Sequence, residues 1–404
     1  MEKITLPERP DWREKAKEVG FTFADMHGEP YWDESSAYRF SLREIEEDIE
    51  DPSSELHAMC REAVDTITKD EALMTKLGIA PLHHDLVANS WADGAPELYG
   101  RFDLAYDGTG PAKLLEYNAD TPTSLYETSA FQWDWLEEQI ANGVLQDGDD
   151  QFNGLHEALI ARFQELFEKG TDLHFTAMAD SPEDYATVES LGWAARAAGL
   201  GAHYFELQKL ALSTDGQFLD DKDQVIGTLF KLYPWEDLLN DEYATHIATS
   251  GCHMLEPAWK AVVSNKGILP VLWQMFEGHP NLLPAFFEAD VARALDGQEA
   301  GPERFSSVAE QFQAGYVRKP IFSREGAAVE IIRAGTTIEA TAQSGYGEFP
   351  RIVQAYAPLP EFDGFHPVIG SWIVGETCAG IGIREDRARI TQDLSRFKPH
   401  FIRD

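Results

Sequence analysis

Positive charge is scarce in this 404-residue chain, where 33 Lys and Arg stand against 70 Asp and Glu for a formal net charge of −37. Proteins bind nucleic acid by neutralising phosphates with Lys and Arg, so this composition argues against a nucleic-acid partner. Anionic membrane surfaces are disfavoured for the same reason. We therefore predict neither nucleic acid nor membrane among the partners.

Cysteines and long apolar runs are also few. The three cysteines, Cys60, Cys252 and Cys378, show no paired spacing, which argues against a disulfide framework and a zinc site. The longest apolar run, around residues 267–276, is far shorter than the ~18 residues that a membrane span needs. Residues 1–20 are charged throughout and contain no secretory core. Together these absences predict a protein of the reducing cytoplasm.

The apolar content of 43% is enough for a sizeable core, and the patterns in the chain indicate an α/β protein. Residues 35–80 are expected to be helical, and apolar positions at helical spacing predict another helix over 152–166. A strand over 173–178, a helix capped by Ser181 and a strand over 203–207 form a strand-helix-strand unit, which is typical of an α/β layer.

The last hundred residues have a different character. They contain short β-prone stretches separated by Gly, Pro or charged turns, at residues 316–320, 329–333, 352–356, 368–374 and 380–391. This end of the chain is predicted to be mostly antiparallel sheet with a helix or two.

The stretch from Arg101 to Asn118 is the most informative. Its segment 107–110, Asp-Gly-Thr-Gly, is a turn signal between two β-prone runs and predicts a hairpin. With the turn centred between residues 109 and 110, Asp103 faces Glu116 and Arg101 faces Asn118. Strand alternation then places all four side chains on one face.

Two carboxylates directly opposite each other are destabilising unless positive charge lies between them. A hard cation such as Mg²⁺ supplies that charge, because it binds carboxylate and amide oxygens together with water and substrate phosphates. Arg101 beside it would grip an anion. The alternatives are a solvent-facing hairpin that merely carries charges, or a one-residue register slip that separates the pairs. Residues 119–124 come next and are rich in hydroxyl groups. They could bind a carboxylate or amide substrate, or they could form an ordinary turn.

Two lysines in the C-terminal half suggest a nucleotide site. Lys266 lies in a small-residue segment, Lys319 ends a β-prone run, and the small-residue loop 323–328 follows. Two lysines could bind the phosphates of a nucleotide as point charges, and the backbone of the loop could cover them. No G-x-x-x-x-G-K-[ST] motif occurs, so a Walker-type site is excluded. Residues 352–360 are predicted to form a strand followed by a hinge. The backbone groups of this hinge could form hydrogen bonds with the edge of an adenine base. Arg384 is either a cation for a phosphate or oxyanion, or part of a salt-bridged turn. Taken singly, each of the two lysines is more often a solvated surface charge, and only together do they suggest a site.

These pieces, in this order, resemble the glutathionylspermidine synthase family, and most closely its synthetase-only members. The resemblance runs from about Arg13 to His400. Its carriers are Arg101-Phe-Asp103, Glu116-Tyr-Asn118-Ala-Asp, Ser264-Asn-Lys266, Val317-Arg-Lys319-Pro, Gln354-Ala-Tyr-Ala357 and Gly382-Ile-Arg384-Glu-Asp. The resemblance implies an ATP-grasp fold in which residues 1–165 hold the helical start and the metal-binding hairpin, residues 166–255 form a pre-ATP-grasp-like α/β domain, and residues 256–404 form the nucleotide-binding lobes and lid.

The resemblance also implies a set of site residues. Mg²⁺ would bind Asp103, Glu116 and Asn118. ATP would contact Lys266, Lys319, Gly326, Gln354, Ala355, Tyr356 and Ala357. Arg101 and Arg384 would be catalytic, steadying the transferred phosphoryl group and the reacting carboxylate, and the substrates would meet Thr121, Thr123, Glu183 and Asp184.

The implied activity is an ATP- and Mg²⁺-dependent ligase that joins a glutathione-like peptide or amino-acid carboxylate to a polyamine-like amine through an acyl phosphate. One departure from the family concerns Leu232, which stands where the family has a glutathione-binding threonine, so the acid need not be glutathione. Two alternatives stay open: an ATP-grasp ligase for a different acid and amine, and a catalytically silent nucleotide-binding partner protein. The oligomeric state is left open.

Overall fold

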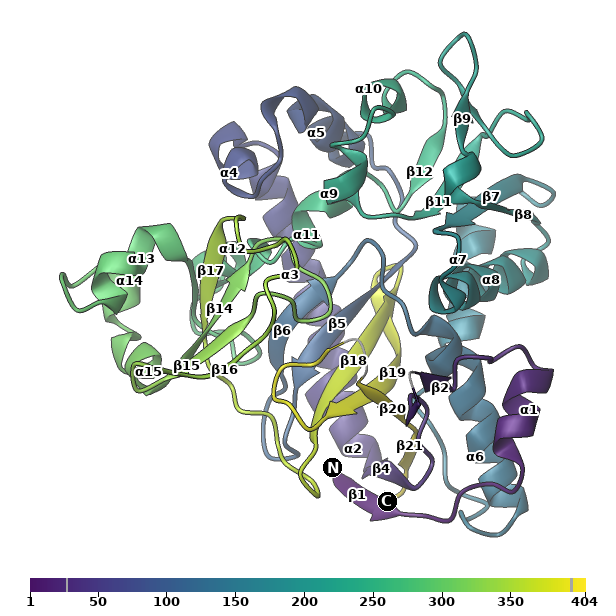
Figure 1. Ribbon diagram of the computed structural model, residues 1–404, viewed down its shortest axis with the longest axis horizontal. Helices are drawn as coiled ribbons and strands as arrows, with labels where there is room; N and C mark the ends of the chain where they lie inside the picture. The colour runs from purple at the N-terminus through teal and green to yellow at the C-terminus, as the bar shows by residue number, and fades with distance from the viewer. Residues whose placement is uncertain (27, 393–394) are drawn as a thin grey trace.

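The computed structural model describes residues 1–26, 28–392 and 395–404 and shows a mixed α/β protein with several sheets (Figure 1). At its centre lies a five-stranded antiparallel sheet with the strand order β20-β19-β18-β5-β6. Its strands are β5 (Tyr99–Ala105), β6 (Lys113–Asn118), β18 (His366–Val374), β19 (Thr377–Asp386) and β20 (Arg396–Lys398). Two strands from the first third of the chain are thus completed by three from its C-terminal end.

The predicted hairpin is confirmed as the β5–β6 pair, with the predicted partners. Asp103 is paired with Glu116 and Arg101 with Asn118. The register shifts directly after Asp103, so that Leu104 pairs with Leu114. This bulge leaves the four predicted side chains on one face.

A second five-stranded sheet is also antiparallel, as predicted for the C-terminal part. Its strand order is β13-β17-β14-β15-β16, with β13 (Ala285–Phe287), β14 (Tyr316–Pro320), β15 (Glu330–Arg333), β16 (Thr336–Ala340) and β17 (Arg351–Ala355). Helices α13 (Glu288–Leu295), α14 (Glu303–Ser306) and α15 (Ala309–Ala314) lie beside it, at the left of Figure 1. The strand predicted over 380–391 is placed differently: β19 begins at Thr377 and ends at Asp386.

The strand-helix-strand unit is confirmed within a parallel sheet of order β12-β11-β7-β8. The sheet contains β7 (Asp172–Ala177), β8 (Gly201–Glu206), β11 (Thr228–Leu232) and β12 (His253–Leu255). Helix α8 (Pro182–Ala197) joins β7 to β8, and the Ser181 side chain caps it by accepting the Asp184 N–H. The helix predicted from Phe152 begins three residues later, as α7 (Leu155–Leu166), because the Phe152 carbonyl accepts the backbone N–H of Ile381 instead of starting a helix.

The prediction of helix over residues 35–80 is wrong at its start. Residues Ser36–Phe40 form β4, the middle strand of a sheet with β1 (Glu2–Thr5) and β21 (His400–Ile402). Helix begins only after Ser41, whose side chain and Glu44 form a capping box. The strand is stabilised by pairing with the distant β21, a contact that local patterns do not encode.

The remaining helices and short strands connect these sheets. They are α1 (Trp12–Glu18), β2 (Asp25–Met26), β3 (Glu29–Pro30), α2 (Leu42–Ile45), η1 (Glu46–Glu50), α3 (Asp51–Ile67), α4 (Glu71–Lys76), η2 (Pro81–His83), α5 (His84–Ala92), η3 (Glu127–Phe131), α6 (Gln132–Ala141), η4 (Leu207–Lys209), β9 (Ala211–Leu212), β10 (Phe218–Leu219), α9 (Trp235–Leu238), α10 (Ala244–Ile247), α11 (Lys260–Val263) and α12 (Ile268–Met275).

The three cysteines are buried and free. Among the described residues, no helix combines the length and the apolar character needed to cross a bilayer. The division at residues 165 and 255 stays a prediction. The central sheet takes strands from both the first and the last of the three predicted segments.

Candidate active site

Two adjoining cavities open on the charged face of the β5–β6 hairpin. The smaller, of about 100 Å³, lies between the hairpin and the sheet that contains β14 and β17. The larger, of about 500 Å³, reaches from the hairpin to the start of α8. Asp103, Glu116, Gly326 and Thr391 line both cavities, so the two spaces meet at the hairpin carboxylates.

Every site residue predicted from the sequence lines one or both of these cavities. The smaller cavity is lined by Asp103, Glu116, Lys319, Gly326, Gln354, Ala355, Tyr356 and Ala357. The larger is lined by Arg101, Asp103, Glu116, Asn118, Thr121, Thr123, Glu183, Asp184, Lys266, Gly326 and Arg384. The structure thus brings together residues from all parts of the chain, while their individual roles stay predictions.

Asp103 lies between two arginines. Its Oδ1 accepts a hydrogen bond from Arg101 Nε at 2.9 Å, and its Oδ2 accepts one from Arg384 Nη2 at 2.8 Å. Arg101 is buried and also donates from Nη1 to the carbonyl of Thr123, 2.8 Å away. A side chain at Gly370 on β18 would collide with the stem of Arg101, so glycine there makes room for the buried guanidinium.

Glu116 lies between two lysines. Its Oε2 is 3.1 Å from Lys266 Nζ, which also donates to the carbonyl of Ser323 at 2.8 Å. Burial alone would raise the pKa of Glu116, but the charges of Lys266, Lys319 and Arg384 outweigh it and hold the pKa at about 2. The carboxylate is therefore ionised at any physiological pH.

Lys319 joins the two sides of the smaller cavity. Its Nζ donates to the Gln354 Oε1 at 2.9 Å and to the carbonyl of Leu115 at 3.0 Å, while Gln354 Nε2 donates to the carbonyl of Leu114. These bonds hold β14 and β17 against β6. Burial lowers the pKa of Lys319 to about 8, with Glu116 opposing the shift. A second negative charge in this cavity would raise that pKa again.

The loop at Gly326 closes over the junction of the two cavities. Gly326 has φ +67°, and a Cβ there would lie 2.5 Å from the carbonyl oxygen of Thr391, so only glycine fits. The adjacent Arg324 reaches across the larger cavity and donates from Nη2 to Thr121 Oγ1 at 2.7 Å. The loop therefore touches both the C-terminal strand region and the predicted substrate segment.

Acidic side chains line the far end of the larger cavity. Glu183 and Asp184 occupy the first turn of α8, and Asp180 and Glu236 line the same cavity, with the Glu236 carboxylate 3.8 Å from Arg324 Nε. Burial raises the pKa of Asp184 and of Glu236. This end of the cavity suits a cationic group, whereas the end at Arg101 and Arg384 suits an anionic one.

Glu127 is a buried carboxyl next to this acidic end. It is 1% exposed and accepts a hydrogen bond from the Tyr31 hydroxyl at 2.7 Å. Burial, and then the charge of Glu183, raise the pKa of Glu127 to about 8. The group is therefore largely protonated at neutral pH.

The chemistry of the donor set fits a hard divalent cation. Asp103, Glu116 and Asn118 present oxygen atoms to one cavity, and Asn118 Nδ2 lies 3.4 Å from Glu116 Oε1, which leaves its amide oxygen for another partner. Within the described residues there is no cluster of three or more His, Cys, Asp or Glu suited to a metal ion. Such a site would therefore depend on the amide, water and phosphate oxygens, as Mg²⁺ sites commonly do.

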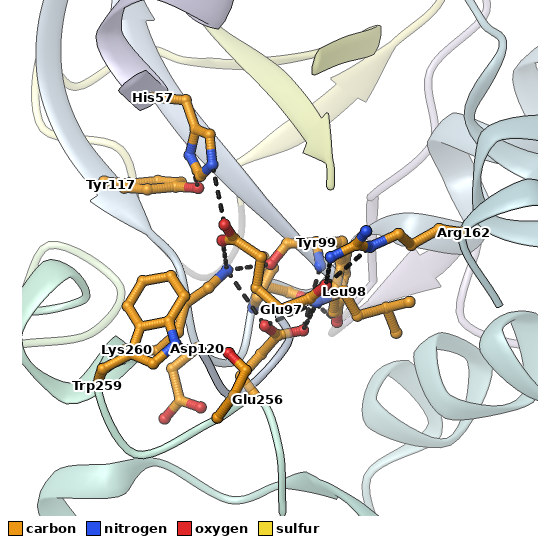
Figure 2. Close-up of polar contacts among 12 residues, drawn as sticks. His57, Glu97, Leu98, Tyr99, Tyr117, Asp120, Arg162, Glu256, Trp259 and Lys260 are labelled. Atoms are coloured by element: carbon orange, nitrogen blue, oxygen red, sulfur yellow. Dashed lines mark hydrogen bonds and ion pairs between the residues drawn. The ribbon is translucent and has the colours of Figure 1, made fainter. Parts of the chain in front are cut away.

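A buried ionic cluster behind the hairpin was not predicted (Figure 2). Lys260 Nζ lies 2.9 Å from Glu97 Oε2 and 3.2 Å from Glu256 Oε2, and it donates to the carbonyl of Tyr99. The Glu256 carboxylate accepts the backbone N–H groups of Leu98 and Tyr99. These contacts fix the start of β5, two residues before Arg101. The spacing of Glu256 and Lys260 is local, but their contacts with residues 97–99 join segments about 160 positions apart, which no local spacing reveals.

Other cavity residues were missed although a signal existed. Val317 lies two residues before Lys319 on β14 and shares its face, so strand alternation would have placed it in the same cavity. Arg324 lies in the small-residue loop 323–328, and no separate role was predicted for its side chain. Asp180 and Glu236 carry no local signal, because the parallel sheet brings them to the cavity. Leu232, in contrast, is a buried core residue of β11 and is not among the residues that line either cavity.

A family model and several relatives match this chain over most of its length. A family model described as glutathionylspermidine synthase preATP-grasp matches residues 3–403. A Haemophilus influenzae protein named "Putative acid--amine ligase" is 39% identical over 416 residues, covering 100% of both chains. The bifunctional glutathionylspermidine synthetase/amidase of Escherichia coli is 22% identical, and the alignment covers 97% of this chain but 63% of that protein. Trypanothione synthetase of Crithidia fasciculata is 26% identical over 84% of this chain and 52% of its own length.

A solved structure shares the fold. A glutathione synthetase-like effector from Globodera pallida superposes with a TM-score of 0.55 at 11% identity, over 91% of this chain and 89% of that one. The fold is thus that of a glutathione synthetase-like protein, with two cavities meeting at a charged hairpin. The chain belongs to the glutathionylspermidine synthase preATP-grasp family and is a ligase of that family.

Proposed function

We propose that this protein is an ATP-grasp ligase that uses ATP and Mg²⁺ to join the carboxylate of a small acid or peptide to an amine. The γ-phosphoryl group of ATP passes to the carboxylate oxygen to give an acyl phosphate and ADP. The amine nitrogen then attacks the acyl carbon, the C–O bond to phosphate breaks, and an amide, phosphate and a proton result.

The observation that carries this proposal is the meeting of two unlike cavities at Asp103 and Glu116. One cavity has mainly apolar walls, including Val317, Ile331 and Leu359, with Lys319 at its polar end, which suits a nucleotide base and its phosphates. The other is polar and has both cationic and acidic walls. Phosphoryl transfer between two bound substrates requires such a shared boundary.

The residues of the chain would act mainly by charge and position. Asp103, Glu116 and Asn118 would hold the Mg²⁺, which supplies charge neutralisation for the phosphates. Arg101 and Arg384 stand beside Asp103, where they would stabilise the charge that develops on the transferred group and the carboxylate. The loop at Gly326 would exclude water from the acyl phosphate.

The two ends of the larger cavity suggest where each substrate binds. The acid would lie toward Thr121 and Thr123, close to the arginines, and the amine toward Glu183 and Asp184. Proteins that this chain resembles are named for glutathionylspermidine and trypanothione synthesis, so a glutathione-like acid and a polyamine-like amine are the first substrates to test. Leu232 lies in the core outside both cavities, so its lack of a hydroxyl does not bear on the choice of acid.

ADP release in the presence of ATP, Mg²⁺ and panels of acids and amines tests the proposal. We expect release that requires one acid and one amine together, with formation of their amide confirmed by mass spectrometry. Turnover with glutathione and spermidine would assign the family's substrates, and turnover with other pairs would assign different ones. ATP binding without turnover for any pair would overturn the proposal in favour of a nucleotide-binding partner protein.

A further inference from the structure

The two five-stranded sheets are joined on both sides of the smaller cavity. On one side, Lys319 and Gln354 of the second sheet donate to backbone carbonyls of β6, an edge strand of the central sheet. On the other side of β5 and β18, residues 389–391 follow β19 and line the same cavity. The hairpin of β15 and β16 reaches these residues and forms a second junction between the sheets.

Glu339 forms a polar bond across this second junction. Four of the five residues of β16 are exposed, whereas the side chain of Glu339, the fifth, is only 19% exposed. Its Oε1 accepts the backbone N–H of Ile390 at 3.0 Å, and its Oε2 lies 3.5 Å from Arg389 Nη1. An edge strand of the second sheet is thus bound to the backbone of a segment that lines the smaller cavity.

Apolar contacts complete the junction. Ile390 belongs to a small buried cluster with Val329 and Ile331, and all three side chains line the smaller cavity. The loop at Gly326 is so close that a Cβ there would lie 2.7 Å from Ile390 Cγ2. Thr341, just after β16, donates from its hydroxyl to the carbonyl of Gly326 at 2.5 Å. The loop and the hairpin are therefore bound to each other as well as to Ile390.

The bond to Ile390 is a large part of what stabilises this junction. A hydrogen bond to a charged group contributes about 1.5–3 kcal/mol, which corresponds to about a tenfold to hundredfold change in an equilibrium between closed and open states. The partly exposed ion pair with Arg389 contributes less than about 1 kcal/mol. Loss of the bond to Ile390 would thus favour an open junction, through which a nucleotide could leave.

We propose that Glu339 is a positioning residue that keeps the β15–β16 hairpin closed over the smaller cavity, and that this bond must break before the nucleotide is released. This inference rests on the proposed nucleotide site. Among the described residues that line the two cavities, Glu339 is absent. It therefore acts through Ile390 and does not contact the nucleotide itself.

The rate at which ADP leaves the protein tests this role. ADP with a fluorescent label on its ribose is bound in the presence of Mg²⁺ and displaced by excess unlabelled ADP in a stopped-flow experiment. We expect Glu339→Ala to raise the dissociation rate about fivefold or more. Glu339→Gln should leave it within about twofold, because the amide oxygen still accepts the Ile390 N–H. Both variants should fold, since β16 is an exposed edge strand, and thermal unfolding checks this.

Glu348→Ala is the matched control, since it removes the same charge from the exposed loop after β16 and should leave the rate within about twofold. An unchanged rate in Glu339→Ala would overturn the role of Glu339. So would an equal rise in Glu339→Gln or in Glu348→Ala, because either would show an effect of charge without the bond. A wild-type protein that does not bind the labelled ADP would instead overturn the proposed nucleotide site, and this role with it.

Discussion

Arg384 Nη2 lies 2.8 Å from Asp103 Oδ2, although 281 positions separate the two residues in the chain. Strand β18 runs between their strands, with Gly370 paired to Asp103. The stem of Arg101 lies over this glycine, which has no side chain to displace it. The candidate site is thus closed by a charge pair between the first third and the end of the chain.

Replacing the central carboxylate tests the role of this pair. Asp103→Asn should lower turnover of ATP about 100-fold or more, because a ligand for Mg²⁺ and the counter-charge for two arginines are lost together. The free energy of unfolding should fall by about 3 kcal/mol, because the amide keeps one accepting oxygen but turns an N–H₂ group toward the other arginine and leaves buried Arg101 without its counter-charge. Steady-state ADP release and chemical denaturation measure the two effects. Asp107→Asn, in the exposed turn of the same hairpin, is the control, and normal turnover in Asp103→Asn would remove Asp103 from the site.

The nucleotide assignment depends on Lys319. Lys319→Met keeps a buried stem of similar length but removes the charge, so ATP affinity should fall about tenfold or more while the fold is kept. Titration of a non-hydrolysable ATP analogue measures the Kd. Lys69→Met, in the exposed turn after α3, should bind as the wild type does. A wild-type Kd in Lys319→Met would exclude this lysine from phosphate binding.

If the acidic end of the larger cavity binds the amine, a change there should affect the KM for the amine alone. Glu183→Gln should raise the KM for the amine about tenfold through loss of a charge partner, and leave the KM for the acid within about twofold. Initial rates with one substrate varied at a time give both values. Glu189→Gln lies on the same helix and pairs with Arg196, away from the cavity, so it serves as the control. Equal changes in both KM values would mean that the two substrates share this wall, and a rise in the KM for the acid alone would mean that they are placed the other way round.

The raised pKa of Glu127 should make the free energy of unfolding depend on pH. Its pKa is raised to about 8 in the folded state, above the usual value near 4.5, so the folded protein holds a proton that the unfolded chain releases. The resulting stability is fully present below about pH 4.5 and is lost as the pH rises toward about 8, with a slope of up to about 1.4 kcal/mol per pH unit. Glu127→Gln removes this contribution, and its free energy of unfolding should fall less steeply than that of the wild type from pH 5.5 to 8.5. Parallel denaturation curves at both ends of that range would contradict the shift.

The sequence predicted the parts of the site that obey local rules. The turn at residues 107–110 was enough to give the pairing of Asp103 with Glu116, because hairpin register follows from turn position. The cap at Ser181 was equally local. These elements depend on neighbours in the chain, which pattern and spacing record directly.

Long-range contacts could not be predicted, because pattern and spacing record only neighbours in the chain. Strand β4 was predicted as helix because its β partner, β21, lies at the other end of the chain. The cluster of Glu97, Glu256 and Lys260 joins segments about 160 positions apart, and Glu127 owes its shifted pKa to burial that only the packed fold creates. Each depends on which distant segments meet, and no single stretch of sequence contains that information.

The order of strands in the central sheet has a consequence for biosynthesis. While the ribosome is still adding residues before β18, strand β5 has no partner on its β18 side, and Arg101 and Asp103 have not met Arg384. That edge of β5 therefore stays unpaired until residues 369–374 have been made, and unpaired strand edges favour aggregation.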